Sequence, residues 1–433
     1  MKFIAKSYES CFLLILFLLS AFFFTFPGES EAIPAFARQT GQSCSSCHYQ
    51  HFPTLNSFGR AFKAGGYSMV GDQKLVEDED VSLPASLNLA LLGTLQYVDG
   101  ETDTEVGYPA ALSLYAGGRI GRESGFLIEL PFENAETEVV DSTGATEEFK
   151  TGSALANYGS MKWNYVTDVK GINVGLNVYS SEGTGPAYGY ELLSTGAMGM
   201  SVAVGGVNAM GAIGLHMEHG ATLMSNFSRS KATGGMAGSA TGYGVSAQTD
   251  NWFVYASQYY NKKMIEHTTD PRFANYLRAA WTPSFGGFDL GMGLQIYTGK
   301  TKTATDAAQD AKAITFDFQA QGDVAGMPCG IYATYAEAPK SSSSTTNWYN
   351  GSTQGDNSAY SILGEFGVME KLAVSLGYVN ATYYGSIGEE KGTSTVVGVN
   401  YLIAANKRLE VKYVDIGGDF NNQSTAGTLQ IGF

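Results

Sequence analysis

Apolar and polar residues alternate one by one in many short segments of the chain. In the stretch 171–178, Ile172, Val174 and Leu176 alternate with Asn173 and Gly175, and the same period of two recurs at 287–296, 314–319, 408–413 and 428–433. Successive side chains of a strand point to opposite faces, so each segment predicts a strand with one apolar face. No long helical period follows residue 80, and the pattern therefore predicts an all-β fold over 84–433.

The links between these segments alternate in length. Short links lie at 121–123, 167–170, 284–286, 368–370 and 404–405, and long polar links lie at 99–109, 134–151, 298–312, 338–356 and 416–424. Short turns at one end and long loops at the other are typical of outer-membrane barrels, and a closed barrel satisfies its backbone polar groups in lipid. The chain also ends on an apolar alternation at Phe433. We therefore predict a transmembrane antiparallel β-barrel of 16–18 strands with an aqueous lumen. A soluble β protein is the alternative, and the strand number depends on 211–227 and 242–250.

The first 32 residues differ from the rest in their pattern. Lys2 and Lys6 precede an apolar run at 11–26, which ends at a proline and a glycine, and small residues follow at Ser30 and Ala32. This is the pattern of a secretory signal that is cleaved off. A retained membrane anchor is the alternative, but such a helix needs about 20 apolar residues. Removal of the signal would also remove Cys11.

Composition agrees with a barrel and narrows the class of partner. The 433 residues carry a net charge of −15, only 15% are charged, and Gly (54), Tyr (26) and Phe (24) are abundant. A lipid-facing surface excludes charge, which explains the low charged fraction, and the acidic excess argues against nucleic-acid binding. The acids gather at 77–80, 99–105 and 133–148. In outer loops they would attract cations or face lipopolysaccharide through bridging divalent ions.

Three cysteines remain after the signal, an odd number that does not suggest a disulfide framework. Cys44 and Cys47 belong to the sequence C-x-x-C-H, which His48 completes and which attaches a c-type haem. One helical turn spans the two thiols that bond the porphyrin, and the next residue can ligate the iron. A thioredoxin-type pair lacks its βαβ surroundings, and a half zinc site lacks a second ligand pair. We therefore predict one covalent haem c, with Cys44 and Cys47 as anchors and His48 as the proximal iron ligand; Cys329 is predicted to be an inert strand residue.

The residues after the motif predict a short helix from Asn56 to the pair at 65–66. Phe58 and Phe62 are four residues apart and share one face, so they could cover the haem or form a small helix core. Arg60 and Lys63 could pair with haem propionates or lie in solvent.

The second axial ligand is left open by the sequence. His51 lies only three residues after His48 and would have to reach the opposite face of the ring, which is geometrically unfavourable. Met69 could fold over the ring, and His216 could approach from the barrel, where it is predicted to face the lumen. The iron could also be five-coordinate. Ligand identity sets the reduction potential.

These observations divide the chain into four parts. Residues 1–32 are the signal, 33–76 a monohaem cytochrome c module, 77–83 an acidic linker and 84–433 the porin-like barrel.

The N-terminal module also resembles a known family. The stretch from Ile33 through the C-x-x-C-H motif, followed by Phe52-Pro53, Leu55-Asn56, Phe58-Gly59, Phe62-Lys63 and Gly66-Tyr67, resembles the fused outer-membrane cytochrome–porins of iron-oxidising bacteria. Over the barrel the resemblance is one of architecture only. It implies an electron-transfer oxidoreductase of the outer membrane that oxidises extracellular Fe(II). The electron would pass through one haem to a periplasmic carrier, a cytochrome or a copper protein. Cys44, Cys47 and His48 are the residues carried over.

Two other functions fit the same sequence. The protein could be a selective porin whose haem module acts as a plug or redox gate, or it could export electrons to an external acceptor.

Overall fold

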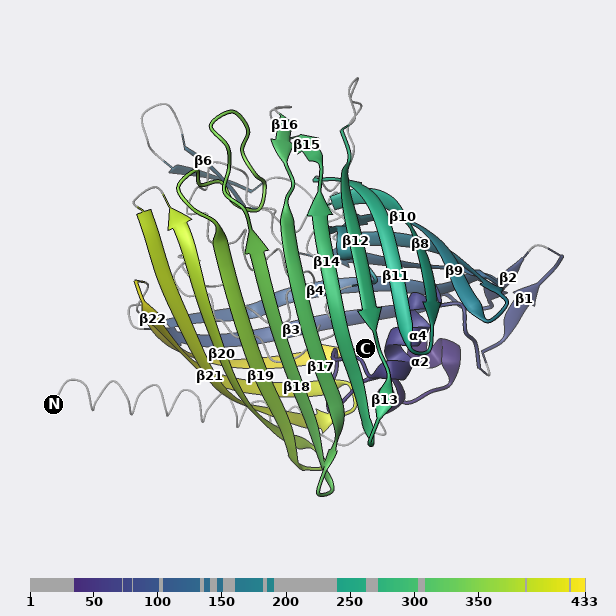
Figure 1. Cartoon of the computed structure of the whole chain (residues 1–433). Helices are drawn as coiled ribbons and strands as arrows, with labels where there is room; N and C mark the ends of the chain where they lie inside the picture. Colours follow the sequence, from purple (N-terminus) through teal and green to yellow (C-terminus); the bar gives the residue numbers. More distant parts are fainter. Residues whose placement is uncertain are drawn as a thin grey trace.

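The barrel strands close on themselves into one antiparallel sheet in the computed structural model (Figure 1). The structure describes residues 35–71, 73–79, 81–100, 104–132, 136–140, 146–150, 160–181, 185–190, 240–261, 272–302, 308–385, 388–419 and 422–432. The last strand, β23 (Asn422–Gly432), pairs with the first barrel strand, β3 (Leu89–Gly100), through partners such as Leu429 and Leu95. This pairing leaves no free edge in the described barrel, as a structure that spans lipid requires.

The described barrel has 16 strands, because β12 and the two-residue β13 both pair with β14 and together form one strand. The other barrel strands are β4 (Thr104–Gly121), β5 (Ser124–Pro131), β8 (Ser160–Val169), β9 (Ile172–Ser181), β10 (Ala240–Thr249), β11 (Trp252–Tyr260), β12 (Ala274–Trp281), β13 (Ser284–Phe285), β14 (Phe288–Thr298), β17 (Ala313–Val324), β18 (Met327–Ala338), β19 (Asn357–Met369), β20 (Leu372–Gly385), β21 (Gly388–Ala404) and β22 (Lys407–Gly418). Short hairpins β6 (Glu136–Val140) with β7 (Thr146–Lys150), and β15 (Lys300–Lys302) with β16 (Ala308–Asp310), lie outside this sheet.

The two faces of the barrel have the reverse of the polarity of a water-soluble protein. On β9 the side chains of Val174, Leu176 and Val178 are exposed, whereas Asn177 is buried. On β22 the charged side chains of Arg408, Glu410 and Lys412 are all buried in the interior, as the alternation predicts. Apolar side chains that face outward, with polar ones inside, are what a lipid-facing wall requires.

The connections fix the orientation of the barrel. Tight turns join β4 to β5, β8 to β9, β10 to β11, β17 to β18, β19 to β20 and β21 to β22, all at one end. The longer connections leave the strands at the other end, after Pro131, Ser181, Tyr260, Thr298 and Ala338. Since short turns face the periplasm in outer-membrane barrels and long loops face outward, the architecture is that of a Gram-negative outer-membrane protein.

Some sequence expectations change. The links expected at 99–109 and 416–424 are shorter, because β3, β4, β22 and β23 extend into them. Acidic residues can belong to these strand extensions, because the extensions project past the lipid and water reaches both of their faces. Residues 242–249 form most of β10, whereas 211–227, the predicted signal at 1–32 and Phe433 lie outside the described residues. The region expected as a linker at 77–83 belongs to a hairpin of β1 (Leu75–Glu77) and β2 (Ser82–Pro84).

Three short helices precede the barrel: α2 (Ala35–Thr40), α3 (Cys44–Cys47) and α4 (Ser57–Ala64). Among the described residues, no helix has the length and apolar character needed to cross a membrane. Helix α2 packs against β4, and Figure 1 shows α2 and α4 towards the short-turn end of the barrel. We call residues 35–71 the N-terminal module from here on.

Candidate functional site

The C-x-x-C segment forms a single helical turn. Helix α3 spans Cys44 to Cys47, and the amide of His48 closes it by donating to the carbonyl of Cys44 at 2.9 Å. Both thiols are free and only half-buried. Partial burial raises the pKa of the Cys44 and Cys47 thiols. The turn therefore presents two protonated thiols on one short helix, directly before a histidine.

Asn56 ties this turn to the next helix. Its side-chain oxygen accepts from the amide of Gly59 at 2.9 Å and so caps the N-terminus of α4. Its side-chain nitrogen donates to the carbonyl of Ser46 at 3.0 Å, and its backbone amide donates to the carbonyl of Cys47 at 3.0 Å. The helix start predicted at Asn56 is thus confirmed. The bonds from Asn56 to the C-x-x-C turn could not be predicted from the sequence.

Gly59 lets the two helices approach each other. A Cβ atom at this position would lie 2.2 Å from the carbonyl oxygen of Cys47 and 3.0 Å from Leu55. Gly59 is itself buried on the inner face of α4. Only glycine fits this close contact, which fixes the distance between α4 and the C-x-x-C turn.

His48 is held in a defined orientation. Its ring Nδ1 lies 3.2 Å from the carbonyl oxygen of Thr54, so Nδ1–H donates and Nε2 keeps its lone pair. Burial lowers the pKa of His48 and favours the neutral ring that a metal needs. A hydrogen bond from the second ring nitrogen is the usual support of a metal-bound histidine. The donor set of two free thiols on one turn and an oriented neutral imidazole therefore fits a covalent haem c.

An aromatic cluster supports the other side of α4. Phe36 of α2 stacks on Tyr67 with ring centroids 4.8 Å apart, and Phe62 meets both rings edge-on at 5.2 and 5.7 Å. Phe62 thus belongs to a small helix core, one of the two expected roles. Phe58 is 41% exposed and remains available to cover a flat ligand.

Tyr49 fastens the module to the barrel wall. Its hydroxyl lies 2.5 Å from the carbonyl oxygen of Gly322 on β17 and 3.0 Å from that of Cys329 on β18, and it also accepts from the amide of Gly322. Cys329 is buried in its strand, as expected of an inert residue. Tyr49 follows His48 directly, so this contact fixes the motif relative to the wall.

His51 is bound to the wall by both ring nitrogens. Arg408 of β22 donates to Nδ1 at 2.9 Å, and Nε2 lies 3.4 Å from a carboxylate oxygen of Glu365 on β19. All three side chains are buried. Nδ1 also lies 3.0 Å from the carbonyl oxygen of Phe52, so both ring nitrogens are engaged by protein groups. The geometry therefore speaks against His51 as the second axial ligand and makes it a docking residue.

Arg60 also contacts the wall. Its guanidinium donates to the carbonyl of Leu55 at 2.9 Å and to the side chain of Gln321 on β17 at 3.2 Å. Burial lowers its pKa to about 10. Arg60 is thus packed against the barrel rather than solvated, whereas Lys63 borders a cavity between α4 and the wall.

Met69 and His216 are the other two candidates for the second axial haem ligand. Met69 is 39% exposed, and its segment is fixed by Gln39, whose side-chain amide donates to the carbonyls of Tyr67 and Met69 at 2.6 and 2.7 Å. The oxygen of Gln39 accepts from the amide of Arg119 on β4 at 3.0 Å. Sequence reasoning missed Gln39, which carries no signal beyond a polar residue inside a short helix. His216 lies outside the described residues.

Within the part of the chain that the structure describes, no group of three or more His, Cys, Asp or Glu side chains could hold a metal ion. The described residues therefore show no iron site that is made of protein side chains alone.

Several solved outer-membrane proteins are similar to this chain in fold. They include OmpT of Vibrio cholerae (TM-score 0.46, 11% identity, 83% of this chain and 100% of that chain). A mutant of the porin of Rh. blastica (0.45, 12%, 80% and 100%) and OpdK of Pseudomonas aeruginosa with vanillate (0.43, 10%, 80% and 98%) are similar too. No protein family and no curated protein matches the chain. Since these TM-scores stay below 0.5, the fold rests on the chain's own closed strand ladder.

Proposed function

We propose that this protein is an outer-membrane barrel that holds one covalent haem c at its periplasmic mouth and carries single electrons across the membrane. The observation that carries the proposal is the position of the C-x-x-C-H turn. Tyr49, the residue directly after the motif, is hydrogen-bonded to β17 and β18 of the barrel wall, close to the short turn that joins these strands.

The residues of the module have separate tasks in this proposal. Cys44 and Cys47 would hold the haem by thioether bonds, and His48 would ligate its iron, with Thr54 orienting the imidazole. When bound, haem c supplies one-electron redox chemistry at its iron. Asn56 and Gly59 fix the geometry of the turn, and Phe58 can exclude water from the haem surface.

The resemblance to cytochrome–porins of iron-oxidising bacteria suggests the donor and the acceptor. Fe(II) outside the cell would be oxidised to Fe(III), which precipitates, and the barrel would keep this product out of the periplasm. The electron would leave to a soluble periplasmic carrier. The half-exposed thiols at the periplasmic mouth support such an exit, because they leave part of the site open.

Stopped-flow spectroscopy of the purified oxidised protein mixed with Fe(II) tests this function. The haem bands should change to their reduced form in a single phase. Bands that stay oxidised, at a pH where Fe(II) can be the donor, would contradict it.

The barrel architecture favours a second function, a selective porin whose module acts as a plug or redox gate. In that case solute flux through liposomes bearing the protein should change with the haem oxidation state. The variant His48→Ala separates the two functions: it should abolish electron transfer and leave flux intact if the haem only conducts electrons.

A further inference from the structure

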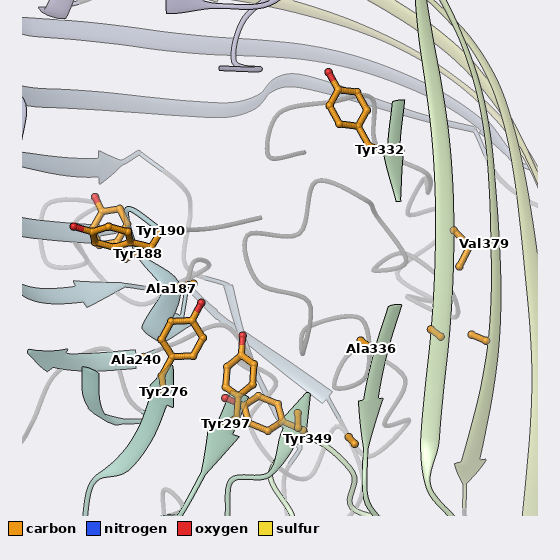
Figure 2. Packing of buried hydrophobic residues seen from close by; sticks show 14 of the residues in the cluster. Ala187, Tyr188, Tyr190, Ala240, Tyr276, Tyr297, Tyr332, Ala336, Tyr349 and Val379 are labelled. Carbon is orange, nitrogen blue, oxygen red and sulfur yellow. The ribbon is translucent and has the colours of Figure 1, made fainter. Parts of the chain in front are cut away.

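A row of tyrosine rings runs through the barrel interior. Tyr190 stacks on Tyr255 with centroids 4.2 Å apart, and Tyr255 meets Tyr276 at 6.0 Å. Tyr276 contacts Tyr297 at 4.9 Å, and Tyr297 contacts Tyr349 at 5.0 Å. Figure 2 shows Tyr190, Tyr276, Tyr297 and Tyr349 in this order, with Tyr332 lying apart. We call Tyr190, Tyr255, Tyr276, Tyr297 and Tyr349 the tyrosine row.

The tyrosine row is shielded from solvent, because all five side chains are at most 6% exposed. They come from five separate parts of the chain: the segment after β9, the strands β11, β12 and β14, and the loop between β18 and β19. A barrel lumen is usually lined by polar groups. Five buried rings in continuous contact are therefore not explained by lumen hydration.

The outer end of the row is an ordered loop. Tyr349 lies in the connection 339–356, and its hydroxyl is 3.0 Å from that of Tyr259. Asn347 holds the loop in place by donating to the carbonyls of Lys312 and Pro339 at 2.9 and 2.7 Å. The neighbouring residues Ser342, Ser343 and Ser344 are exposed. The row thus begins directly below the outer surface.

The inner end of the row reaches the N-terminal module. Tyr190 and Phe253 border the cavity between α4 and the wall, together with Leu55 and Arg60. Ala64 of α4 packs against the same buried cluster. Gly59 of α4 lies close to the carbonyl of Cys47, so the inner end of the row reaches the helix that packs on the C-x-x-C turn.

We propose that the tyrosine row is the path by which electrons cross the barrel between the outer loops and the haem-bearing module. This inference rests on the proposed electron-transfer function. A one-electron donor of the Fe(II) class would lose one electron at the outer end, and the haem that Cys44, Cys47 and His48 would hold would take it up. The rings would mediate this transfer without a change in their own oxidation state, because ferric haem is too weak an oxidant to leave a tyrosine oxidised.

Three of the five phenols have a partner that can hold the proton while a strong oxidant, such as a photo-oxidant, has oxidised the ring. Tyr349 shares its hydroxyl proton with Tyr259, Tyr297 donates to the side-chain oxygen of Gln295 at 2.6 Å, and Tyr255 donates to that of Asn177 at 2.9 Å. The proton can move towards its partner on oxidation and return on reduction, with no net proton transfer.

A photo-oxidant attached at the outer loop tests the proposal. The exposed position is made reactive by Ser343→Cys, and the haem-loaded full chain is labelled there with a ruthenium polypyridyl complex. Flash-quench then generates a strong one-electron oxidant. With ferrous haem, the electron should pass outward and the haem should become ferric in a fast intramolecular phase. With ferric haem, a tyrosyl radical should be trapped and seen by electron paramagnetic resonance.

Tyr255→Phe combined with Tyr276→Phe keeps both rings and removes both phenols. This variant should lose the fast phase and most of the radical signal. The matched control Tyr360→Phe alters a ring pair on the lipid-facing side, where Tyr360 lies 6.3 Å from Tyr378, and should change neither. Unchanged kinetics and radical yield in the double variant would overturn the proposal. Haem that fails to react with Fe(II), while the radical still forms along the row, would instead contradict the proposed function.

Discussion

The hydroxyl of Tyr49 lies 3.0 Å from the carbonyl oxygen of Cys329, which joins the residue directly after the C-x-x-C-H motif to the barrel wall. His51 and Arg60 make three further contacts with the wall, to Glu365, Arg408 and Gln321. A module attached in this way cannot rotate freely in the mouth. Its position is therefore set by hydrogen bonds whose removal has measurable consequences.

Removing the docking contacts should open the barrel. In the double variant Tyr49→Phe with His51→Ala, the module loses several hydrogen bonds to the wall, each with a net contribution of about 1 kcal/mol. Single-channel conductance in planar bilayers should rise or fluctuate between levels. The control Tyr413→Phe, on the lipid-facing side, should behave like the unaltered protein. Equal conductance of all three would mean that the module does not restrict the pore.

Gly59→Ala should disturb haem attachment. The new Cβ would lie 2.2 Å from the carbonyl oxygen of Cys47, so α4 and the C-x-x-C turn would have to separate. We expect a large loss of covalently bound haem per chain, measured by haem staining of denatured protein. Gly351→Ala, where a Cβ meets no atom within 4 Å, is the matched control. Full haem content in Gly59→Ala would show that the close approach is dispensable.

Asn56 performs two tasks that different substitutions separate. Asn56→Ala removes the helix cap, which costs about 1 kcal/mol, and also the bond to Ser46. Asn56→Asp keeps an acceptor for the amide of Gly59 but cannot donate to Ser46. If the bond to Ser46 positions the C-x-x-C turn, both variants should shift the haem reduction potential. If only the cap matters, Asn56→Asp should retain the original potential.

A buried ion pair inside the barrel allows a stability test. Arg278 and Asp317 form a bidentate pair, with N–O distances of 2.5 and 2.9 Å, and both side chains are buried. Asp317→Ala leaves an unpaired buried charge, which costs roughly 3–5 kcal/mol. The melting temperature measured by calorimetry should fall clearly. Adding Arg278→Met to this variant should recover part of the loss, and no recovery would assign the effect to packing alone.

The sequence predicts the barrel well because its signals are local. Alternation at Ile172, Val174 and Leu176 reports which face meets lipid, and this decides most strands. Loop lengths are less accessible, since Thr104 and Glu105 belong to a strand that continues past the membrane. Nothing local distinguishes a polar residue in such an extension from one in a loop.

The site is predicted only in part, for a related reason. The spacing of Cys44, Cys47 and His48 is a chemical requirement within one helical turn and can be read from the sequence. The contacts of His51 with Glu365 and Arg408, in contrast, join residues more than 300 positions apart. Such pairs depend on how the barrel closes around the module. From the sequence alone, a histidine near the motif is therefore a candidate haem ligand, and only the structure shows its contacts with the barrel wall.

The most direct test of this account is the haem content of the mature protein. The full chain, produced in a Gram-negative host with cytochrome c maturation, should give one haem per chain in a pyridine haemochrome assay, with the haem retained after denaturation. Cys44→Ser with Cys47→Ser should give none. A value of zero for the unaltered chain, or haem that is lost on denaturation, would contradict the account.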